Sequence, residues 1–97
     1  MANALVSIQI LPRTPGNEDV IPYVDKAIEI IANSGVKYEV QPLETTMEGD
    51  LDHLLEIVKQ MNRAMTEMGC PSVISQIKML YKPGGASMDK LTEKYRK

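Results

Sequence analysis

The stretch Val36–Asp50, VKYEVQPLETTMEGD, decides the fold because it holds two short strands and the start of a long helix. Apolar and polar residues alternate over Val36–Gln41, which is the period of a β-strand. Pro42 has no N–H to give to a strand ladder, so it interrupts the alternation. A further short strand is expected over Glu44–Glu48, and Asp50 is expected to cap the helix that follows. The stretch therefore predicts two strands that lead directly into a helix.

The rest of the chain shows the same two periodicities on either side of this stretch. Pro12 is expected to end the first strand, and Gly69 is expected to stop the second long helix. Asp19 is a good N-cap for the first helix. The expected elements are a strand over Ala4–Leu11, a helix over Val20–Ser34, a helix that begins at Leu51 and stops at Gly69, a strand over Ser72–Tyr81 and a short terminal helix capped by Ser87.

The order β-α-β-β-α-β, followed by a helical tail, predicts an α+β fold in a single domain over residues 1–97. Each β-α-β crossover is expected to be right-handed, so two interleaved units form a four-stranded antiparallel sheet with both helices on one face. This is the ferredoxin-like arrangement. It leaves the other face of the sheet uncovered by the two helices.

The uncovered face bears on assembly. Along the first and last strands, the residues expected on it are polar in the middle of each strand and apolar at the ends. A monomer would normally make such a face fully polar, so the mixture favours a face that meets another subunit around a hydrogen-bonding patch. The sequence therefore predicts a homo-oligomer. The residues expected on this face are Leu5, Ser7, Gln9, Leu11, Ile74, Gln76, Lys78 and Leu80.

Composition argues against several classes of function. The net charge of −2 provides no basic stripe for the phosphates of nucleic acid. No run approaches the ~20 apolar residues of a membrane span, and the first residues lack the basic region of a signal peptide. A single cysteine, Cys70, allows no internal disulfide and suits a reducing compartment. We expect a cytoplasmic protein with neither a membrane nor a nucleic-acid partner.

No catalytic or metal centre can be read from the sequence. His53 and Cys70 are the only histidine and cysteine, whereas zinc needs three or four nitrogen or sulfur ligands. They are separated by about one helix length, ~25 Å at 1.5 Å per residue, so a Cys–His dyad within one subunit is not expected. Gly84-Gly85 matches neither phosphate-loop pattern, and an ordinary turn is favoured. We expect no enzymatic activity, no metal and no cofactor.

The polar residues of the third strand are the candidate binding site. Met47 is expected to point into the core, which sends Thr46 and Glu48 to the uncovered face beside Ser7 and Gln9. Hydroxyl, amide and carboxylate groups would then converge on one patch, as in a site for a small polar ligand. The alternative is that the threonines only supply β-propensity and that Glu48 only precedes a turn.

The whole chain resembles the small thiamine-binding protein family. The resemblance rests on VSIQILP near the start, YVDKAIEII in the first helix, GVKYEVQPLETTMEGD in the middle, and KMLYKPGG with a terminal Lys-Tyr-Arg. It implies a ferredoxin-like subunit, assembly into a homotetramer through sheet contacts, and binding of thiamine or its hydroxymethylpyrimidine half without enzymatic activity. The ligand contacts that the resemblance transfers to this chain are Ser7, Gln9, Tyr38, Thr45, Thr46 and Glu48.

Two hypotheses of different classes follow from these features. The leading one is a non-catalytic, cytoplasmic protein that binds thiamine or a pyrimidine precursor near the sheet and the subunit interface. The alternative is a structural or regulatory homo-oligomeric module whose polar residues only stabilise the assembly. An enzyme acting on a thiamine precursor is disfavoured, because no acid–base pair is evident around the lone histidine.

Overall fold

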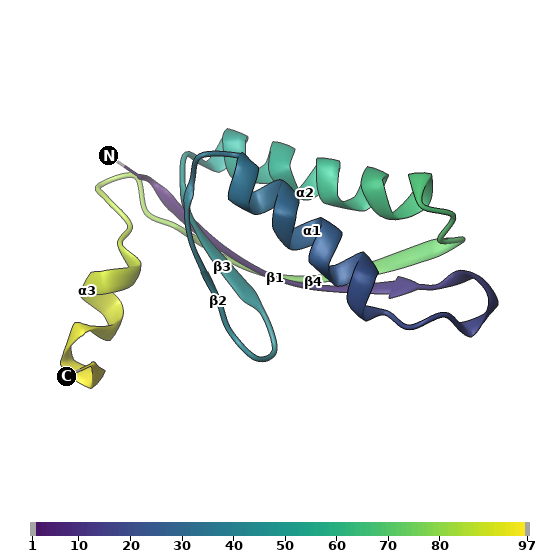
Figure 1. Ribbon diagram of the computed structural model, residues 1–97. Helices are drawn as coiled ribbons and strands as arrows, with labels where there is room; N and C mark the ends of the chain where they lie inside the picture. The colour runs from purple at the N-terminus through teal and green to yellow at the C-terminus, as the bar shows by residue number, and fades with distance from the viewer. Residues whose placement is uncertain (1, 97) are drawn as a thin grey trace.

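The computed structural model describes residues 2–96, and its strands and helices follow one another in the predicted order. They are β1 (Ala4–Arg13), α1 (Ile21–Asn33), β2 (Lys37–Val40), β3 (Thr45–Gly49), α2 (Leu51–Glu67), β4 (Ser72–Tyr81) and α3 (Met88–Thr92), with 3-10 turns at Pro15–Asn17 and Glu93–Tyr95. The strands form one sheet in the order β2-β3-β1-β4, with antiparallel neighbours. Figure 1 shows α1 and α2 on one side of the sheet and α3 on the other side at one end. The predicted α+β fold is confirmed. Within residues 2–96, no helix is long and apolar enough to cross a bilayer.

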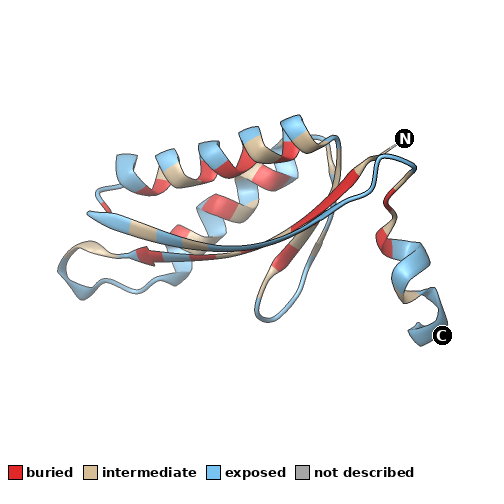
Figure 2. Cartoon of the chain, turned by 180° about the vertical axis from the view of Figure 1, so that it is seen from behind, coloured by how far each residue is buried: buried red, intermediate tan, exposed pale blue. Residues whose placement is uncertain are grey.

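The core lies between the two long helices and one face of the sheet. The even-numbered residues of the central strand β1 face the helices; Val6, for example, lies opposite Met47 on β3 and Met79 on β4. Figure 2 shows buried residues along β1 and on the sides of α1 and α2 that face the sheet. The largest side chains with almost no exposed area are Ile31, Met47, Leu54, Ile57, Met61, Met65 and Val6.

Strand β1 continues through Pro12, so the prediction that it ends there is wrong. It pairs with β4 as far as Arg13, whereas its pairing with β3 stops at Ile8. Backbone groups along a strand point alternately to its two neighbours, and the 2.8 Å bond from Lys82 N to Asn3 O shows that odd-numbered residues point to β4. The nitrogen of Pro12 therefore points to the side where β3 has no residue. Its missing N–H costs no ladder bond there.

Helix α2 is capped by a residue remote in sequence. Asp50 occupies the predicted N-cap position, but its side chain accepts no hydrogen bond from the helix. The side-chain oxygen of Asn3 accepts from the N–H of Leu51 at 2.9 Å, and the Asn3 amide donates to the Asp50 carboxylate at 3.2 Å. Asn3 thus satisfies one of the free N–H groups of the first turn. It ties the beginning of β1 to the junction between β3 and α2.

The segment after β4 folds onto one end of the open face, a packing that the sequence pattern does not predict. Leu5 is expected on a face left free for another subunit, but only 8% of it is exposed. It packs in a small cluster with Ala86 and Met88. Ser87 caps α3 as predicted, because its hydroxyl accepts from the N–H of Lys90 at 3.3 Å. Part of the open face is therefore covered from within the chain.

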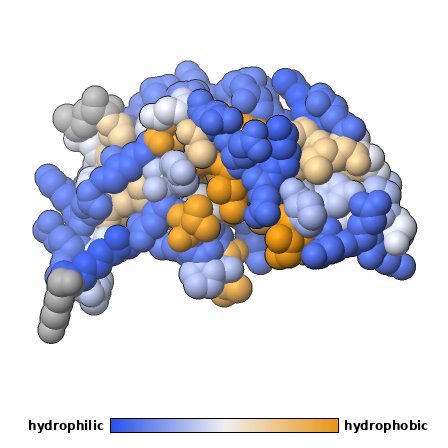
Figure 3. Space-filling view, in the orientation of Figure 1, coloured by the Kyte–Doolittle hydropathy of each residue, from blue (hydrophilic) through white to orange (hydrophobic). Residues whose placement is uncertain are grey.

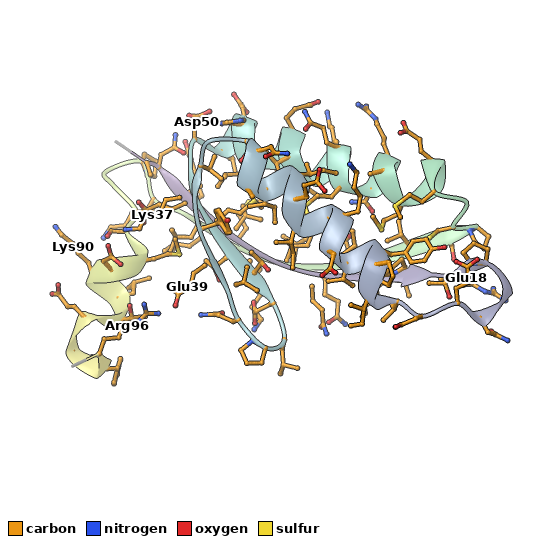
Figure 4. The ribbon with its side chains drawn as sticks, in the orientation of Figure 1. Glu18, Lys37, Glu39, Asp50, Lys90 and Arg96 are labelled. Atoms are coloured by element: carbon orange, nitrogen blue, oxygen red, sulfur yellow. The ribbon has the colours of Figure 1, made fainter. Side chains whose placement is uncertain are left out.

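Two ion pairs fasten this C-terminal segment to β2. Lys37 pairs with Asp89, and Arg96 Nη2 lies 2.7 Å from Glu39 Oε1. Figure 4 shows the side chains of Arg96 and Glu39 pointing toward each other between α3 and the sheet. The hydrogen bond within the first pair raises the pKa of Lys37 and lowers the pKa of Asp89. Because both pairs are exposed, they orient the segment more than they stabilise it.

Strand β4 is an edge of the sheet and exposes apolar side chains on both faces. On the helix side, Ile77 and Met79 have the predicted orientation, but 40% and 48% of them are exposed, because no further strand lies beyond β4. A long edge with exposed apolar residues is a typical site of association. The exposed apolar residues of β4 are Ile74, Ile77, Met79, Leu80 and Tyr81.

Tyr23 on α1 provides a test of how the loop before this helix is packed. Its hydroxyl donates to the Glu18 carboxylate at 2.5 Å, and this bond, with burial, raises the pKa of Tyr23 to about 12. The folded state favours the protonated phenol, so this contribution to stability is complete below pH 10.0 and is lost as the pH rises toward 12. Tyrosinate absorbance during alkaline titration should show Tyr23 ionising late. Glu18→Gln should lower the pKa of Tyr23. Glu29→Gln, on the exposed side of α1, is the control and should leave that pKa unchanged. If Tyr23 ionises together with the other tyrosines, this packing is contradicted.

Candidate functional site

A connected group of polar side chains crosses the middle of the open face. Ser7 on β1 lies opposite Thr46 on β3 and Lys78 on β4. The Thr46 hydroxyl donates to Ser7 Oγ at 3.3 Å, and Ser7 Oγ donates to the Glu44 carboxylate. Lys78 Nζ lies 3.4 Å from the other oxygen of Glu44. We call Ser7, Glu44, Thr46 and Lys78 the open-face cluster.

The turn between β2 and β3 delivers Glu44 to this cluster. Gln41 N donates to Glu44 O at 2.9 Å, which closes a tight turn around Pro42 and Leu43. Proline suits the beginning of such a turn because its φ is already fixed. Residues two apart on an extended chain share a face, so Glu44 projects on the same side as Thr46. Its carboxylate can then reach Ser7 on the neighbouring strand.

The open-face cluster is partly shielded from water. Ser7 and Thr46 are half-buried, and 28% of the Glu44 side chain is exposed against 84% of Lys78. An ion pair with so exposed a lysine contributes little. A carboxylate has about four acceptor positions, and two contacts within the cluster leave Glu44 free to accept more. The arrangement can therefore receive an amino group or a cation of a ligand.

Two hollows adjoin the cluster and share Leu5 and Thr46. One of about 240 Å³ lies toward β4, and one of about 120 Å³ lies against the C-terminal segment. Apolar surface with a few polar groups is the usual lining of a small-molecule site. The first hollow is lined by Leu5, Ser7, Thr46, Lys78, Met79 and Leu80, and the second by Leu5, Glu39, Gln41, Thr46, Met88, Leu91, Thr92 and Arg96.

Four of the six predicted contact residues lie on this face. Met47 is 0% exposed in the core, which confirms the predicted orientation of its neighbours on β3. Ser7 and Thr46 are hydrogen-bonded members of the cluster. Gln9 follows Ser7 on the same face of β1, opposite Gln76. Glu48 is the fourth.

Glu48 has a different immediate partner from the one expected. Its Oε1 accepts from the N–H of Met88 at 2.8 Å, where α3 begins. In the structure, therefore, Glu48 anchors the C-terminal segment, and Glu44 is the carboxylate that contacts Ser7. A contact between Glu48 and a ligand stays a prediction.

The structure does not bring Tyr38 and Thr45 to the cluster. Thr45 lies opposite Ile8 and Tyr38 opposite Met47, and both partners belong to the core side of the sheet. Successive side chains of a strand point to opposite faces. Only 6% of Thr45 is exposed, whereas Tyr38 is exposed at the sheet edge.

Sequence reasoning placed Glu44 among the polar residues of the third strand and Lys78 on the open face, but it named neither as a ligand contact, and it missed the C-terminal segment as part of the site. The alternation of β4 identifies the face of Lys78, but the lysine gives no further signal. Alternation from Thr46 predicts the face of Glu44 as well, but it does not predict that the Glu44 carboxylate bonds to Ser7. For the C-terminal segment, the signal is the set of nonpolar positions Met88, Leu91 and Tyr95 within a largely polar tail.

A larger hollow of about 630 Å³ lies at the turn after β4. Gly85 N donates to Lys82 O at 2.9 Å, so the glycine pair forms a turn, as predicted. Lys82, Lys90 and Glu48 all line the hollow. The Glu48 carboxylate would repel an anion at short range, so the two lysines do not make a phosphate site.

Comparison with known proteins identifies the family. The family model described as thiamine-binding protein matches residues 6–97. The chain belongs to this family. A UPF0045 protein of Clostridium perfringens is 50% identical over 91 residues, which make up 94% of this chain and 95% of that relative.

Solved structures of similar sequence have the same fold. A domain of unknown function, DUF77, from Bacillus cereus is 41% identical with a TM-score of 0.90, over 98% of this chain and 92% of that one. The crystal structure of a "putative thiamine biosynthesis/salvage protein" from Thermotoga maritima is 32% identical with a TM-score of 0.85, over 96% and 98% of the two chains. The thiamine-binding family thus supports a small-molecule ligand for this chain.

Proposed function

We propose that the protein binds thiamine, or its hydroxymethylpyrimidine half, without transforming it. The description of the family supports a ligand of this kind. The observation that carries the proposal is the Glu44 carboxylate, which is held beside Ser7 on a face partly shielded from water. The ligand site is the open-face cluster with its two hollows.

The chemistry of the cluster suits an aminopyrimidine. The ring carries an amino donor beside nitrogen acceptors. Glu44 can accept from the amino group in a charge-assisted hydrogen bond while it keeps its bond from Ser7, and the Thr46 hydroxyl can turn away from Ser7 to donate to a ring nitrogen. Leu5 and Leu80 offer apolar surface for the ring. The cationic thiazolium of thiamine is compatible with a chain of net charge −2.

We propose further that the protein acts as a homo-oligomer, a tetramer as the family resemblance implies, in the cytoplasm. The apolar residues Leu11, Ile74 and Leu80 remain exposed around the cluster. Covering them by another subunit would also remove water from the cluster, which strengthens its hydrogen bonds to a ligand. The free, buried Cys70 suits a reducing compartment.

The alternative function is a structural or regulatory module with no dedicated ligand. One observation favours it: the polar groups of the cluster already bond to one another, and Glu48 already serves the C-terminal segment. In that case the cluster would only join β1, β3 and β4 on the open face.

Calorimetric titration with thiamine, thiamine phosphate and hydroxymethylpyrimidine tests the proposal. We expect at least one of the three compounds to bind. In thermal unfolding, ligand at a hundred times its Kd should add ~2.7 kcal/mol to the apparent stability of the folded protein. Thr46→Val removes one neutral hydrogen bond and should weaken binding about 2–10-fold. Thr45→Val, on the other face of the same strand, is the matched control. If none of the three compounds binds while light scattering reports an intact oligomer, the module alternative is favoured.

A further inference from the structure

The C-terminal segment is attached firmly to the sheet where it begins. Ala86 N donates to Ala2 O at 2.9 Å. Two residues later, Met88 N donates to Glu48 Oε1 at 2.8 Å. Met88 is 7% exposed, because it packs with Ala86 against Leu5. Two hydrogen bonds and a buried cluster thus fix residues 86–88 against β1 and β3.

The remainder of the segment, Asp89–Arg96, buries much less of its surface; we call it the outer part. Its two large apolar side chains, Leu91 and Tyr95, are 56% and 74% exposed. Figure 3 shows mostly hydrophilic side chains over this end of the chain, at the lower left. An element with few buried apolar contacts opens more easily than the core does. The outer part is therefore the least firmly packed helical piece of the open face.

The outer part is joined to β2 by charge. Lys37 pairs with Asp89 and Glu39 pairs with Arg96, and each of the four side chains is exposed by a third or more. Water and salt screen charges that are so exposed. A pair of this kind shifts an equilibrium between two positions by about 1.5–5-fold. The two pairs favour the observed position of the outer part without fixing it there.

The outer part also forms one wall of the smaller hollow beside the open-face cluster. Thr46 of the cluster lines this hollow, Glu39 lines it from β2, and Leu91 and Arg96 line it from the outer part. The volume is about 120 Å³, whereas pockets for small molecules generally have about 300–1,000 Å³. A ring can enter beside Thr46 only if a wall moves, and the wall held by exposed charges moves most easily.

The anchors determine how this wall can move. Both of them, the bond to Glu48 and the cluster with Leu5, act at Met88, the first residue of α3. Ser87, just before it, has an extended backbone with φ −143° and is not part of the helix. A swing of α3 about Met88 therefore displaces Leu91 slightly and Arg96 most. Such a swing breaks the ion pairs to β2 and leaves the anchors in place.

We propose that the outer part, Asp89–Arg96, is a lid on the ligand site of the open face. In the closed position, which the structure shows, Leu91 and Arg96 confine the hollow beside Thr46. In the open position, the ion pairs to β2 are broken and the hollow is wide enough to admit or release the ligand. Lids of this kind control the rates of entry and release. The lid rests on the function proposed for the open-face cluster, but its motion is measurable without a ligand.

A spin label tests the motion in the free protein. Lys94→Cys places a reactive thiol on the exposed surface of the outer part, whereas Cys70 is 4% exposed and out of reach of the label. A nitroxide at position 94 should broaden the amide signals of Glu39 and Val40 on β2. Salt at 1 M should weaken this broadening, because the Debye length is then about 3 Å. Broadening that changes neither with salt nor with Arg96→Gln would overturn the lid.

Binding rates test what the lid does to the ligand. Arg96→Gln should raise the association and dissociation rates of thiamine or hydroxymethylpyrimidine together, by about 1.5–5-fold, and leave Kd within about twofold. A contact between Arg96 and the ligand would instead weaken the affinity through the dissociation rate alone, and the lid would then be wrong. NMR line shapes during a titration give both rates.

Two further variants serve as controls for these rates. The double variant Glu39→Arg/Arg96→Glu exchanges the two charges and should return both rates to those of the unaltered protein. Lys26→Gln removes a similarly exposed ion pair, with Glu29 on α1, and should change neither rate. Equal effects of Lys26→Gln and Arg96→Gln would mean that net charge alone sets the rates, which would overturn the lid.

Three outcomes separate the lid from the proposed function. If the label responds to salt while thiamine, thiamine phosphate and hydroxymethylpyrimidine all fail to bind, the proposed function fails and the lid stands. If one of them binds while the label does not respond, the proposed function stands and the lid is wrong. If the broadening follows protein concentration instead of salt, and light scattering reports a change in size, a second copy of the chain holds the segment and the lid is also wrong.

Discussion

Leu54→Ala is expected to lower the free energy of unfolding by about 2–5 kcal/mol. Leu54 is 0% exposed on α2, and its Cδ2 lies 3.2 Å from where a Cβ on Gly49 would be. Truncation leaves a cavity beneath the end of β3, because the rigid helix and sheet can close it only in part. Chemical denaturation followed by circular dichroism measures the loss. The open-face cluster depends on β3 for Thr46, so ligand affinity should fall in parallel if the strand shifts.

The matched control for this variant is Leu43→Ala. Leu43 is 75% exposed in the turn after β2, and surface substitutions usually change stability by less than about 0.5 kcal/mol. The comparison keeps the chemical change constant and varies only burial. Equal destabilisation by the two substitutions would mean that the turn is packed against something, such as another copy of the chain.

Glu44→Gln is expected to weaken binding of thiamine, or of hydroxymethylpyrimidine, about 10–150-fold. The charge-assisted hydrogen bond that it removes contributes about 1.5–3 kcal/mol. The amide that replaces the carboxylate can still accept from Ser7, so the cluster and the fold should persist. Isothermal titration calorimetry gives the affinity, and thermal unfolding confirms the fold.

Comparison with Glu48→Gln decides which of the two carboxylates accepts a hydrogen bond from the ligand. Its amide oxygen can still accept from the N–H of Met88, so α3 should stay in position. The affinity for thiamine or hydroxymethylpyrimidine should then change by less than about twofold, which corresponds to the free-energy change of an ordinary surface substitution. A large loss with Glu48→Gln and none with Glu44→Gln would restore the sequence-based prediction for Glu48 and contradict the proposed role of Glu44.

Local patterns were sufficient to predict most of the fold. Alternation predicted β4 with the observed limits, Ser72–Tyr81. Gly69 has a φ of +99° and follows the end of α2, as expected of a residue that stops a helix. Pro12 was misjudged because the cost of a proline depends on whether a strand lies on the side of its nitrogen. That is a property of the whole sheet, and no local window of sequence contains it.

The candidate site could be predicted only to the level of a face. Period-two alternation around Met47 correctly places Thr46 with Ser7 on the open face. The same alternation places Glu44 and Glu48 on that face together, so it cannot tell which carboxylate is engaged elsewhere. The answer depends on where the C-terminal segment folds, and that is determined by Leu5, Met88 and two ion pairs between residues far apart in sequence.

The order of strands in the sheet also sets an order of events during synthesis. The central strand β1 emerges from the ribosome first, whereas both of its neighbours are made later and β4 is the last strand of all. Pairing β1 with β4 closes a loop that contains most of the chain. Closing a loop of that length costs entropy before the new contacts offset it, which makes the pairing slow. Until Tyr81 has emerged, one side of β1 has no partner strand. A nascent chain that stalls before β4 therefore exposes the unpaired edge of a largely apolar strand, which is a strong template for aggregation.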